Sequence, residues 1–361
     1  MLERRETMKQ LLLSGTPREI GFQHGSEAAE EINESIRSYR EFFVHEVSLE
    51  WEDAKEIAKN YIPSIEQHNS DLIEEMEGIA EGANLDFLDI LVLNCRSEIA
   101  LTHNRVDGCT SVGVVPPYGK YTFIAQNWDW TLAQAKSLVM LTIEQKYKPT
   151  IYMTTEAGII GKIGANSNGV AVGLNAIRAA LSSYGMPLHL ALREVLNSET
   201  VEDALEFVKT TEIGSCANFV IGGKFTVYNC EISPMKVEVK KAEDVVYHSN
   251  HLCAENLIST IGKEKLAPPV DSFTRLERMK ILTSSVNVPV TKDIIFEWLS
   301  NDEDTEHPIN RVPKENINEF TDMVTVFSVI MNLTTGQYDL YEGQPSKPKN
   351  IYQLNIYGGI R

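Results

Sequence analysis

The spacing of apolar residues divides the chain into a mostly helical first third and a strand-rich remainder. Between residues 18 and 47, apolar and aromatic side chains recur at intervals that place them on one face of a helix. Similar spacing predicts three further helices, over 51–61, 65–80 and 85–100. A short apolar run at 8–13 precedes them and predicts a first strand.

From residue 109 onward, runs of β-branched and aromatic residues alternate with Gly- and Pro-containing turns. The predicted strands cover 109–115, 121–127, 150–154, 170–175, 218–221, 225–231, 236–240, 324–332 and 338–341. The predicted helices of this part cover 187–196, 201–210, 272–286 and 292–299. Strands grouped on both sides of grouped helices favour an α+β fold. We expect a sheet-on-sheet core covered by helices, not a doubly wound parallel sheet.

One predicted hairpin gathers reactive side chains at its open end. Its strands flank the turn-forming residues 116–119, Pro-Pro-Tyr-Gly. If the strands pair antiparallel, opposed residue numbers sum to about 235. Cys109 then lies near Gln126 and Asn127, and Asp129 overhangs the end where the cysteine stands. A thiol and a carboxylate are thereby expected at one end of one hairpin.

Length and composition indicate a globular protein without a membrane partner. The 361 residues are enough for one large domain or two ordinary ones, with 43% hydrophobic and 23% charged residues. No apolar run approaches the roughly 20 residues that a membrane span needs. The first six residues carry acids and lack the apolar core of a signal peptide, so a cytoplasmic location is expected.

The negative charge is concentrated in the helical third. Of the formal net charge of −18, residues 1–108 contribute −13, from 10 Lys and Arg against 23 Asp and Glu. This balance disfavours a nucleic-acid partner, which would require a basic face. Solvated helix faces explain the acidic third, with a regulatory acidic surface as the alternative. The chain has no glycine-rich phosphate-binding motif, so nothing in it supports nucleotide binding.

The cysteines and histidines do not form a recognisable metal motif. The five cysteines are scattered without a C-x-x-C pair, which argues against a disulfide framework and a zinc ribbon. His248 and His251 form an H-x-x-H pair without a third ligand in context, which is a poor zinc signal. We therefore assign no metal and expect no cofactor.

Cys109 is the candidate nucleophile, and it directly follows Gly108. A cysteine nucleophile needs a base, and no histidine stands in a recognisable context for that role. Cleavage of the Gly108–Cys109 bond would supply one, because the new α-amino group has a pKa near 8. The alternative is that Cys109 is an ordinary small residue buried at a strand start.

Several short strings resemble one known family in order and spacing. They are residues 19–25 (EIGFQHG), 75–83 (EMEGIAEGA), 93–99 (LNCRSEI), 107–111 (DGCTS), 127–130 (NWDW), 168–175 (NGVAVGLN) and 248–251 (HSNH). Spread over nearly the whole chain, they are similar to those of the acyl-coenzyme A:6-aminopenicillanic acid acyltransferase family. That family is part of the N-terminal-nucleophile (Ntn) hydrolase superfamily.

This resemblance implies one domain over residues 1–361 with a four-layer αββα sandwich of two mostly antiparallel sheets. It also implies an inactive precursor that cleaves itself between Gly108 and Cys109 by attack of the Cys109 thiol on the preceding carbonyl. Residues 1–108 would then be a helical pro-segment or α chain, and 109–361 a β chain that begins with the nucleophile. In the mature protein, the Cys109 α-amine would accept the thiol proton.

The resemblance also assigns roles to other residues. Asp129 would orient the α-amine, and Asn250 would donate its amide to the tetrahedral oxyanion. Asn175 matches a position beside the oxyanion site. A solvated turn carboxylate, a polar loop residue and a capping asparagine are the respective alternatives.

The assignments of Asn127, Arg311 and the other cysteines are weaker. Asn127 is expected to hydrogen-bond the hairpin end. Arg311 is the best candidate for the arginine that the superfamily places near the nucleophile, with a surface arginine as the alternative. The cysteines other than Cys109 are taken as structural.

The function expected from these residues is cleavage of a small-molecule amide through an acyl-thioester on Cys109. Water or an amine would resolve that intermediate, so hydrolysis and acyl transfer both stay open, with acyl-coenzyme A as one acyl donor. A peptide or N-acyl-amino-acid hydrolase of the same superfamily is an alternative. A non-catalytic descendant that binds a ligand is another, although retention of Cys109, Asp129 and Asn250 together argues against it. Assembly into a homo-oligomer is left open.

Overall fold

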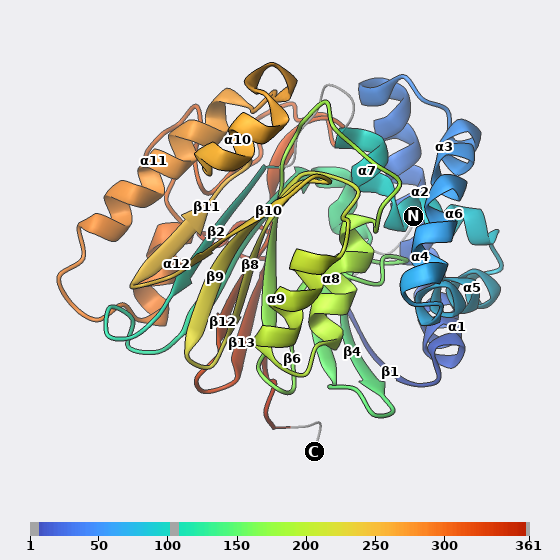
Figure 1. Ribbon diagram of the computed structural model, residues 1–361, viewed down its shortest axis with the longest axis horizontal. Helices are drawn as coiled ribbons and strands as arrows, with labels where there is room; N and C mark the ends of the chain where they lie inside the picture. The colour runs from blue at the N-terminus through green and yellow to red at the C-terminus, as the bar shows by residue number, and fades with distance from the viewer. Residues whose placement is uncertain (1–6, 102–107, 359–361) are drawn as a thin grey trace.

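Two β-sheets lie face to face at the centre of the structure, and helices cover both outer surfaces (Figure 1). The computed structural model describes residues 7–101 and 108–358. The layers follow the order helix, sheet, sheet, helix, which confirms the expected αββα sandwich. No helix within the described ranges is both long and apolar enough to cross a membrane.

The larger sheet has eight strands in the order β1-β4-β5-β6-β7-β8-β9-β10. Its strands are β1 (Lys9–Gly15), β4 (Leu138–Gln145), β5 (Ile151–Glu156), β6 (Ile163–Asn166), β7 (Ala171–Ala176), β8 (Ala217–Gly223), β9 (Thr226–Ile232) and β10 (Val237–Lys241). Only the edge pair β1 and β4 is parallel among the described pairings of this sheet. The N-terminal segment thus contributes β1 to this sheet, whereas the other strands of the sheet all follow residue 137.

The smaller sheet has six strands in the order β11-β2-β3-β12-β13-β14, and every described pairing is antiparallel. Its strands are β2 (Gly108–Val114), β3 (Phe123–Thr131), β11 (Val245–His248), β12 (Met323–Asn332), β13 (Gln337–Glu342) and β14 (Asn350–Asn355). The central strands β2 and β3 are buried along their whole length, as expected where a sheet is covered on both faces.

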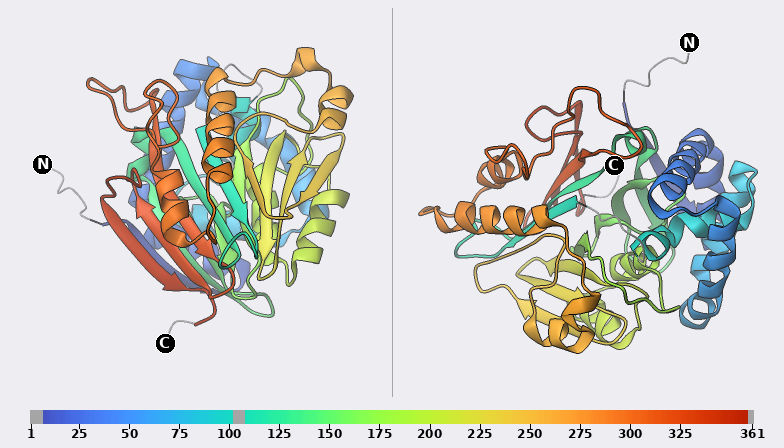
Figure 2. Two further views of the ribbon diagram at one scale, coloured as in Figure 1. Left: turned by 90° about the vertical axis from the view of Figure 1, so that its left-hand side faces the viewer. Right: turned by 90° about the horizontal axis from the view of Figure 1, so that it is seen from above.

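The helices form two separate covers (Figure 2). The larger sheet is covered by α1 (Pro17–Glu27), α2 (Ala29–Phe42), α3 (Trp51–Ala58), α4 (Ile62–His68), α5 (Asp71–Ala83), α6 (Phe87–Asn94), α7 (Arg96–Leu101), α8 (Leu188–Asn197) and α9 (Val201–Thr210). The smaller sheet is covered by α11 (Val270–Ser284) and α12 (Lys292–Leu299). The short α10 (Glu255–Ile261) lies near β10.

Several predicted boundaries were wrong. The single helix expected over 18–47 is divided at Ala28, where the backbone leaves helical geometry, and it ends in a π-helical turn over Phe43–Val47. Strand β4 was missed, because its Leu and Met residues also favour helices and its pairing with β1 is long-range. Strands β11 and β14 were missed as well; β14 alternates only between half-buried and exposed residues at a sheet edge.

Helices α1 and α5 pack backbone to backbone through four glycines. A Cβ atom on Gly21 would lie 2.0 Å from the carbonyl oxygen of Glu75, and one on Gly78 would lie 2.3 Å from that of Arg18. Gly25 and Gly82 have the same relation to the opposite helix. Only glycine permits this approach, so the strings at 19–25 and 75–83 serve helix packing.

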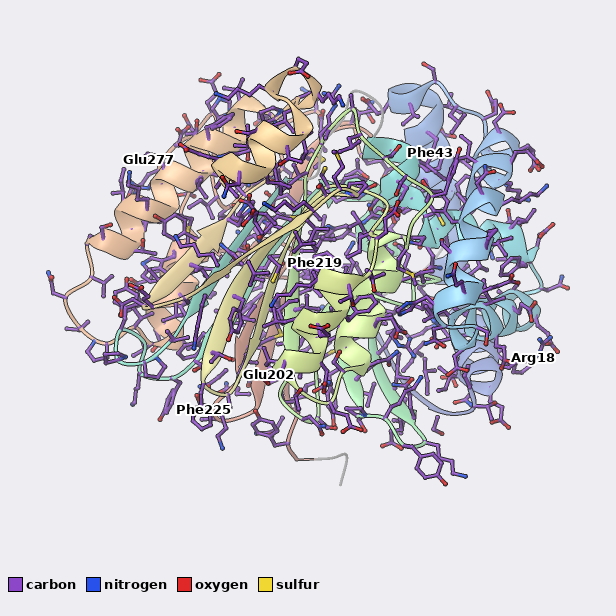
Figure 3. The ribbon with its side chains drawn as sticks, in the orientation of Figure 1. Arg18, Phe43, Glu202, Phe219, Phe225 and Glu277 are labelled. Carbon is purple, nitrogen blue, oxygen red and sulfur yellow. The ribbon has the colours of Figure 1, made fainter. Side chains whose placement is uncertain are left out.

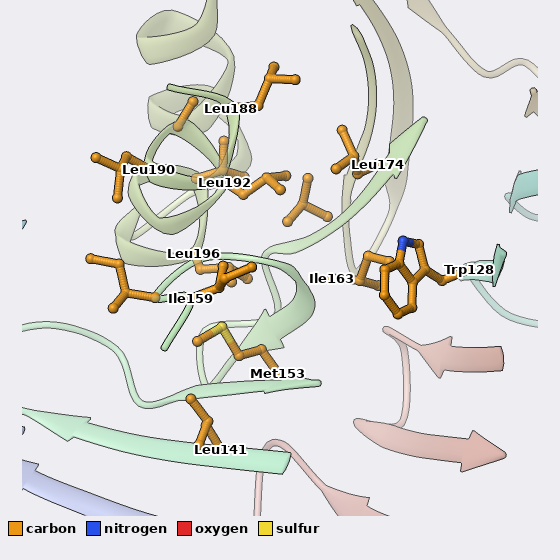
Figure 4. Close-up of a cluster of buried hydrophobic side chains, with 14 of the residues drawn as sticks. Trp128, Leu141, Met153, Ile159, Ile163, Leu174, Leu188, Leu190, Leu192 and Leu196 are labelled. Carbon is orange, nitrogen blue, oxygen red and sulfur yellow. The ribbon is translucent and has the colours of Figure 1, made fainter. Parts of the chain in front are cut away.

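The main core fills the space between the sheets and extends beneath the helices of the larger sheet. Trp128 of β3 lies against Ile163 of β6, with Leu174 of β7 close by (Figure 4). Phe219 on β8 is fully buried, whereas Phe225 in the turn after β8 is 76% exposed (Figure 3). A second core joins the smaller sheet to α11 and α12.

Candidate active site

The hairpin formed by β2 and β3 carries Cys109 at its open end. Cys109 is opposed to Trp128 and Gly108 to Asp129, so opposed residue numbers sum to 237. The predicted sum was about two too small, because the connecting loop runs from Val115 to Thr122 and is centred one residue further along the chain than the expected turn at 116–119. Asp129 nevertheless stands at the end of the hairpin where the cysteine begins.

The two faces of this hairpin present different chemistry. Directly opposed residues of an antiparallel pair point to the same face, and neighbours along a strand point to opposite faces. Ser111 bonds to Asn175 of the larger sheet, so Ser111 and Cys109 face the space between the sheets. Asp129 therefore lies on the opposite face from the Cys109 side chain. Asp129 can therefore act on the backbone nitrogen of Cys109 but not directly on its sulfur.

The backbone nitrogen of Cys109 is held by Asn250. Its N–H donates to Asn250 Oδ1 at 2.9 Å, and both residues are fully buried. His248, the last residue of β11, is paired with Ser111 of β2. Asn250 follows two residues later, so it lies at the level of Cys109, where the chain leaves the sheet. The Ser272 hydroxyl accepts the Asn250 backbone N–H at 2.7 Å and fixes this exit.

The orientation of the Asn250 amide is set by its partners. Oδ1 also accepts a hydrogen bond from Arg275 Nη2 at 2.8 Å, while Nδ2 donates to the Ala176 carbonyl at 2.9 Å. An amide nitrogen carries two hydrogens, so one N–H of Asn250 is left for another acceptor beside Cys109. This is the group that the sequence analysis expected to serve the oxyanion.

Arg275 on α11 is a site residue that the sequence analysis did not identify. Its side chain is completely buried, and Nη1 donates to the Cys109 carbonyl at 2.5 Å and to Thr110 Oγ1 at 3.0 Å. One guanidinium thereby holds the carbonyl of Cys109 and, through Asn250, its amide nitrogen. The only sequence signal was an Asp271-x-x-x-Arg275 spacing on a predicted helix, which is too common to single out a site.

Asp129 lies in a buried ionic environment. Its Oδ2 is 2.9 Å from Arg311 Nε, and its Oδ1 accepts from the Thr325 hydroxyl at 2.7 Å. A register shift in β12 between Thr325 and Phe327 sits opposite this point, and such bulges re-aim a side chain. Burial raises the pKa of Asp129 to about 6, even though Arg311 and Arg275 oppose that shift.

Asp271 joins the two arginines of the site. Its Oδ2 accepts from Arg275 Nε at 3.0 Å and also pairs with Arg311 Nη2. Although burial by itself raises the pKa of Asp271, the two guanidiniums lower it overall. A continuous chain of charges, Arg275, Asp271, Arg311 and Asp129, therefore runs around the end of the hairpin.

The two remaining asparagines have different positions. Asn175 lies between the sheets, where its Oδ1 accepts from Ser111 Oγ at 2.6 Å, one pleat along β2 from Cys109. Asn127 faces the helical side and donates to the carbonyls of Leu299 and Ile309 at 2.8 and 2.9 Å. Asn127 thus tethers the loop that carries Arg311, in keeping with the hydrogen-bonding role expected at the hairpin end.

A buried charge cluster lies behind Trp128 on the inner face. Lys162 Nζ is 3.9 Å from the centre of the Trp128 ring and 2.8 Å from Glu156 Oε2. Arg96 Nη2 lies 3.2 Å from Glu156 Oε1. Burial alone would raise the pKa of Glu156, but the two cations lower it well below its usual range. Cationic side chains are thereby brought next to the aromatic residue opposite Cys109.

The structure brings Gly108, Cys109, Asp129, Asn250 and Arg311 to one place, with Asn175 one pleat away. Residue 107 of the string at 107–111 lies outside the described residues. Arg311, half-buried in its ion pairs, is part of the site and is not a surface arginine.

The other cysteines fall into two groups. Cys95, Cys216 and Cys230 are buried, and burial raises the pKa of each thiol, which keeps it protonated and unreactive. Cys253, in contrast, is exposed.

Comparison with known proteins places the chain among acyl-transferring enzymes. A family model described as "Acyl-coenzyme A:6-aminopenicillanic acid acyl-transferase" matches residues 117–347. The 40 kDa form of acyl-coenzyme A:6-aminopenicillanic-acid-acyltransferase from Emericella nidulans is 33% identical over 358 residues, covering 97% of this chain and 96% of that protein.

Among solved structures, the chain is similar to a mutant of conjugated bile acid hydrolase from Clostridium perfringens. The TM-score is 0.50 at 13% identity, with 69% of this chain and 92% of that chain covered. At this identity the likeness concerns the fold alone, and that fold is the Ntn-hydrolase sandwich described above.

Proposed function

This chain belongs to the acyl-coenzyme A:6-aminopenicillanic acid acyltransferase family, and we propose that it is a self-cleaving enzyme with Cys109 as its nucleophile. The Ntn-hydrolase fold and the family support acyl transfer or amide hydrolysis as the class of reaction. The observation that carries the proposal is the hydrogen bond from the Cys109 amide nitrogen to Asn250, at a strand end where Gly108 faces Asp129. That nitrogen is the atom that cleavage would turn into an amine.

Self-cleavage would proceed in two steps. The Cys109 sulfur attacks the Gly108 carbonyl carbon, the C–N bond to Cys109 breaks, and the nitrogen takes up a proton to give a thioester with a free α-amine. Water then hydrolyses the thioester, leaving a Gly108 carboxylate and the Cys109 thiol. The cut would divide the domain 1–361 into an α chain, 1–108, and a β chain, 109–361.

In the cut enzyme the Cys109 α-amine would act as the base. It takes the thiol proton, and the thiolate attacks the carbonyl of a small amide substrate or another acyl donor to form an acyl-thioester. The free N–H of Asn250 would stabilise the oxyanion, with Asn175 close to it along β2. Asp129, held by Arg311 and Thr325, would orient the Cys109 nitrogen during self-cleavage and the free α-amine afterwards.

Intact-mass analysis tests the cleavage. Purified protein should give two fragments that meet between Gly108 and Cys109, and Cys109→Ala should give only the full-length chain. Cys216→Ala is a matched control, because it removes a buried thiol outside the site and should leave the two fragments unchanged. A single full-length species from the parent chain, or fragments from Cys109→Ala, would contradict the proposal.

Product analysis separates hydrolysis from acyl transfer. An amide substrate is incubated with and without a competing amine, and the acyl products are quantified. A transferase yields the new amide in proportion to the added amine, whereas a hydrolase yields the free acid in both cases. Repeating the reaction with an acyl-coenzyme A donor tests whether a thioester is accepted. No acyl product from any donor would reject the proposed activity.

A further inference from the structure

A second cluster of chemically active side chains lies away from Cys109, in a cavity of about 630 Å³. The cavity is lined by β9, β10, β11 and α11, on the side of the molecule where Figure 1 shows α11 and β11. Glu231 of β9, His248 of β11 and Cys253 after the Asn250 turn are among its lining residues. Cys109 is not, so this cavity is distinct from the proposed active site.

These three residues offer an oxygen, a nitrogen and a sulfur atom that all lie within 4.8 Å of one another. In a tetrahedral zinc site, with metal–ligand bonds of about 2.0–2.3 Å, ligand atoms are separated by roughly 3.3–3.8 Å. The longest of these separations would have to shorten by up to about 1 Å, whereas His248 Nε2 and Glu231 Oε1, which are 2.7 Å apart, would have to move apart by about 0.6 Å. Cys253 is exposed and has room to make that movement, whereas Glu231 and His248 are buried.

The hydrogen bonds of His248 prepare one of its nitrogens for a ligand. Nδ1 lies 2.8 Å from the Ser249 carbonyl, to which it can only donate. Nε2 donates to Glu231 Oε1 at 2.7 Å in an ion pair, so a cation would take the place of the Nε2 proton. A histidine that donates one ring N–H to a backbone carbonyl and presents the other nitrogen to a ligand is the usual arrangement at metal sites.

The carboxylate is also fixed in advance. Glu231 Oε1 accepts the backbone N–H of Cys253 at 2.7 Å, and Oε2 accepts that of Ala254 at 2.8 Å. These bonds hold the turn that carries the thiol against the sheet strand that carries the carboxylate. Glu231 would make the same two bonds if it only capped this turn and bound no metal. A turn cap, however, does not require a thiol beside the carboxylate.

A second nucleophile is a poorer explanation of the cluster. In a Cys–His–Glu relay the imidazole stands between the other two groups and uses a different nitrogen for each. Here Glu231 occupies Nε2 and a carbonyl occupies Nδ1, so neither nitrogen is left to activate the thiol. Three groups that converge on one point suit a shared cation better than a relay.

We propose that Glu231, His248 and Cys253 bind a thiophilic divalent cation of the Zn²⁺ class, with the remaining coordination position open to the cavity. No sequence pattern indicated this site, because the H-x-x-H pattern pairs His248 with His251, and His251 bonds to Ser272 instead. Because His248 and Asn250 are two residues apart, a bound cation would fasten the Asn250 turn to β9 of the larger sheet. The proposal does not depend on self-cleavage.

The experiment uses the full chain with Cys109→Ala and without a polyhistidine tag, so that neither the nucleophile nor a tag binds metal. After removal of metal with a chelator, the protein is titrated with Co²⁺ by absorption and with Zn²⁺ against a chromophoric chelator. One equivalent of each should bind, and Co²⁺ should give a thiolate-to-metal charge-transfer band.

On this background, Cys253→Ser should abolish the band and weaken Zn²⁺ binding by at least the roughly 10–100-fold that loss of an outer-shell partner costs. Glu231→Gln should also weaken binding. Glu238→Gln is the matched control, since Glu238 lines the same cavity outside the cluster. Thermal unfolding of each variant verifies folding. The proposal fails if the parent shows no charge-transfer band, or if Cys253→Ser binds Zn²⁺ as tightly as the parent.

Discussion

Because the carboxylate of Asp129 is buried, lowering the pH should slow self-cleavage but increase the contribution of this group to stability. The pKa of Asp129 is raised to about 6, mainly by burial. If ionised Asp129 orients the Cys109 nitrogen during self-cleavage, the rate should follow the ionised fraction. At pH 7 about ten in eleven molecules carry the charge, and at pH 5 about one in eleven. The rate of cleavage should therefore fall about tenfold between pH 7 and 5.

Stability should respond in the opposite direction. The folded pKa of Asp129 lies above its ordinary value of 3.8, so the folded state binds a proton more readily than the unfolded state. The contribution of this group to stability consequently increases as the pH falls from about 6 to about 4. Slower cleavage at pH 5 cannot then be attributed to unfolding caused by Asp129.

The assay starts from unfolded precursor, in which cleavage has not yet occurred. The chain is diluted from denaturant into buffers over about pH 4.5 to 8, samples are quenched with acid at intervals, and the cut fraction is measured by mass spectrometry. Circular dichroism at each pH establishes that the chain has folded. Asp129→Asn, which removes the charge but keeps the shape, should cleave slowly at every pH and show no limb near 6. A parent rate that is flat between pH 5 and 7, or a limb that persists in Asp129→Asn, would refute the reasoning.

Three further predictions concern the surrounding network and the helix contact. Asp271→Asn removes a negative charge that raises the pKa of Asp129, so the acidic limb of the cleavage profile should move below pH 6; an unmoved limb would contradict the coupling. Arg275→Met should lower the free energy of unfolding by about 3 kcal/mol, the lower end of the range for a broken buried ion pair, because Asp271 keeps its other arginine. The control Arg278→Met, in a partly exposed ion pair on the same helix, should cost about 1 kcal/mol or less in denaturant titrations, and equal losses would be inconsistent with this difference. Gly78→Ala places a Cβ 2.3 Å from a carbonyl of α1 and should cost about 1–3 kcal/mol by the same method, whereas an unchanged midpoint would show that the helices can separate freely.

The sheet-on-sheet core and the hairpin that carries Cys109 were accessible from sequence because short-range patterns indicate them, whereas the four-layer order and the roles of Asn250 and Asn175 came only from the family resemblance. The β2–β3 hairpin was expected from two β-branched runs around a turn, and this hairpin alone brings Asp129 to the level of Gly108. Strand β4 could not be predicted in the same way, since its Leu and Met residues also favour a helix and its pairing with β5 and the distant β1 decides against one.

The parts of the site that escaped prediction depend on tertiary contacts. Arg275 reaches the backbone of Cys109 from a helix far along the chain, as the separation of 166 residues in its bond shows. Nothing local distinguishes it from Arg278 on the same helix, which ends in a partly exposed ion pair. The residue opposite Asp129 likewise depended on the exact register, because an error of about two in the opposed sum changes the partner but leaves the face unchanged.

A cut at Gly108–Cys109 would leave a molecule in which the larger sheet is built from two polypeptides. Strand β1 belongs to the first fragment, residues 1–108, but is the outermost strand of that sheet. Two buried ion pairs also join the fragments, since Glu75 and Arg96 of the first fragment pair with Arg193 and Glu156 of the second. Removing the first fragment would expose the edge of β4, take Glu75 away from Arg193 and leave Glu156 with Lys162 but without Arg96. The two products should thus behave as inseparable subunits, and the second produced alone should aggregate unless the first is supplied in trans.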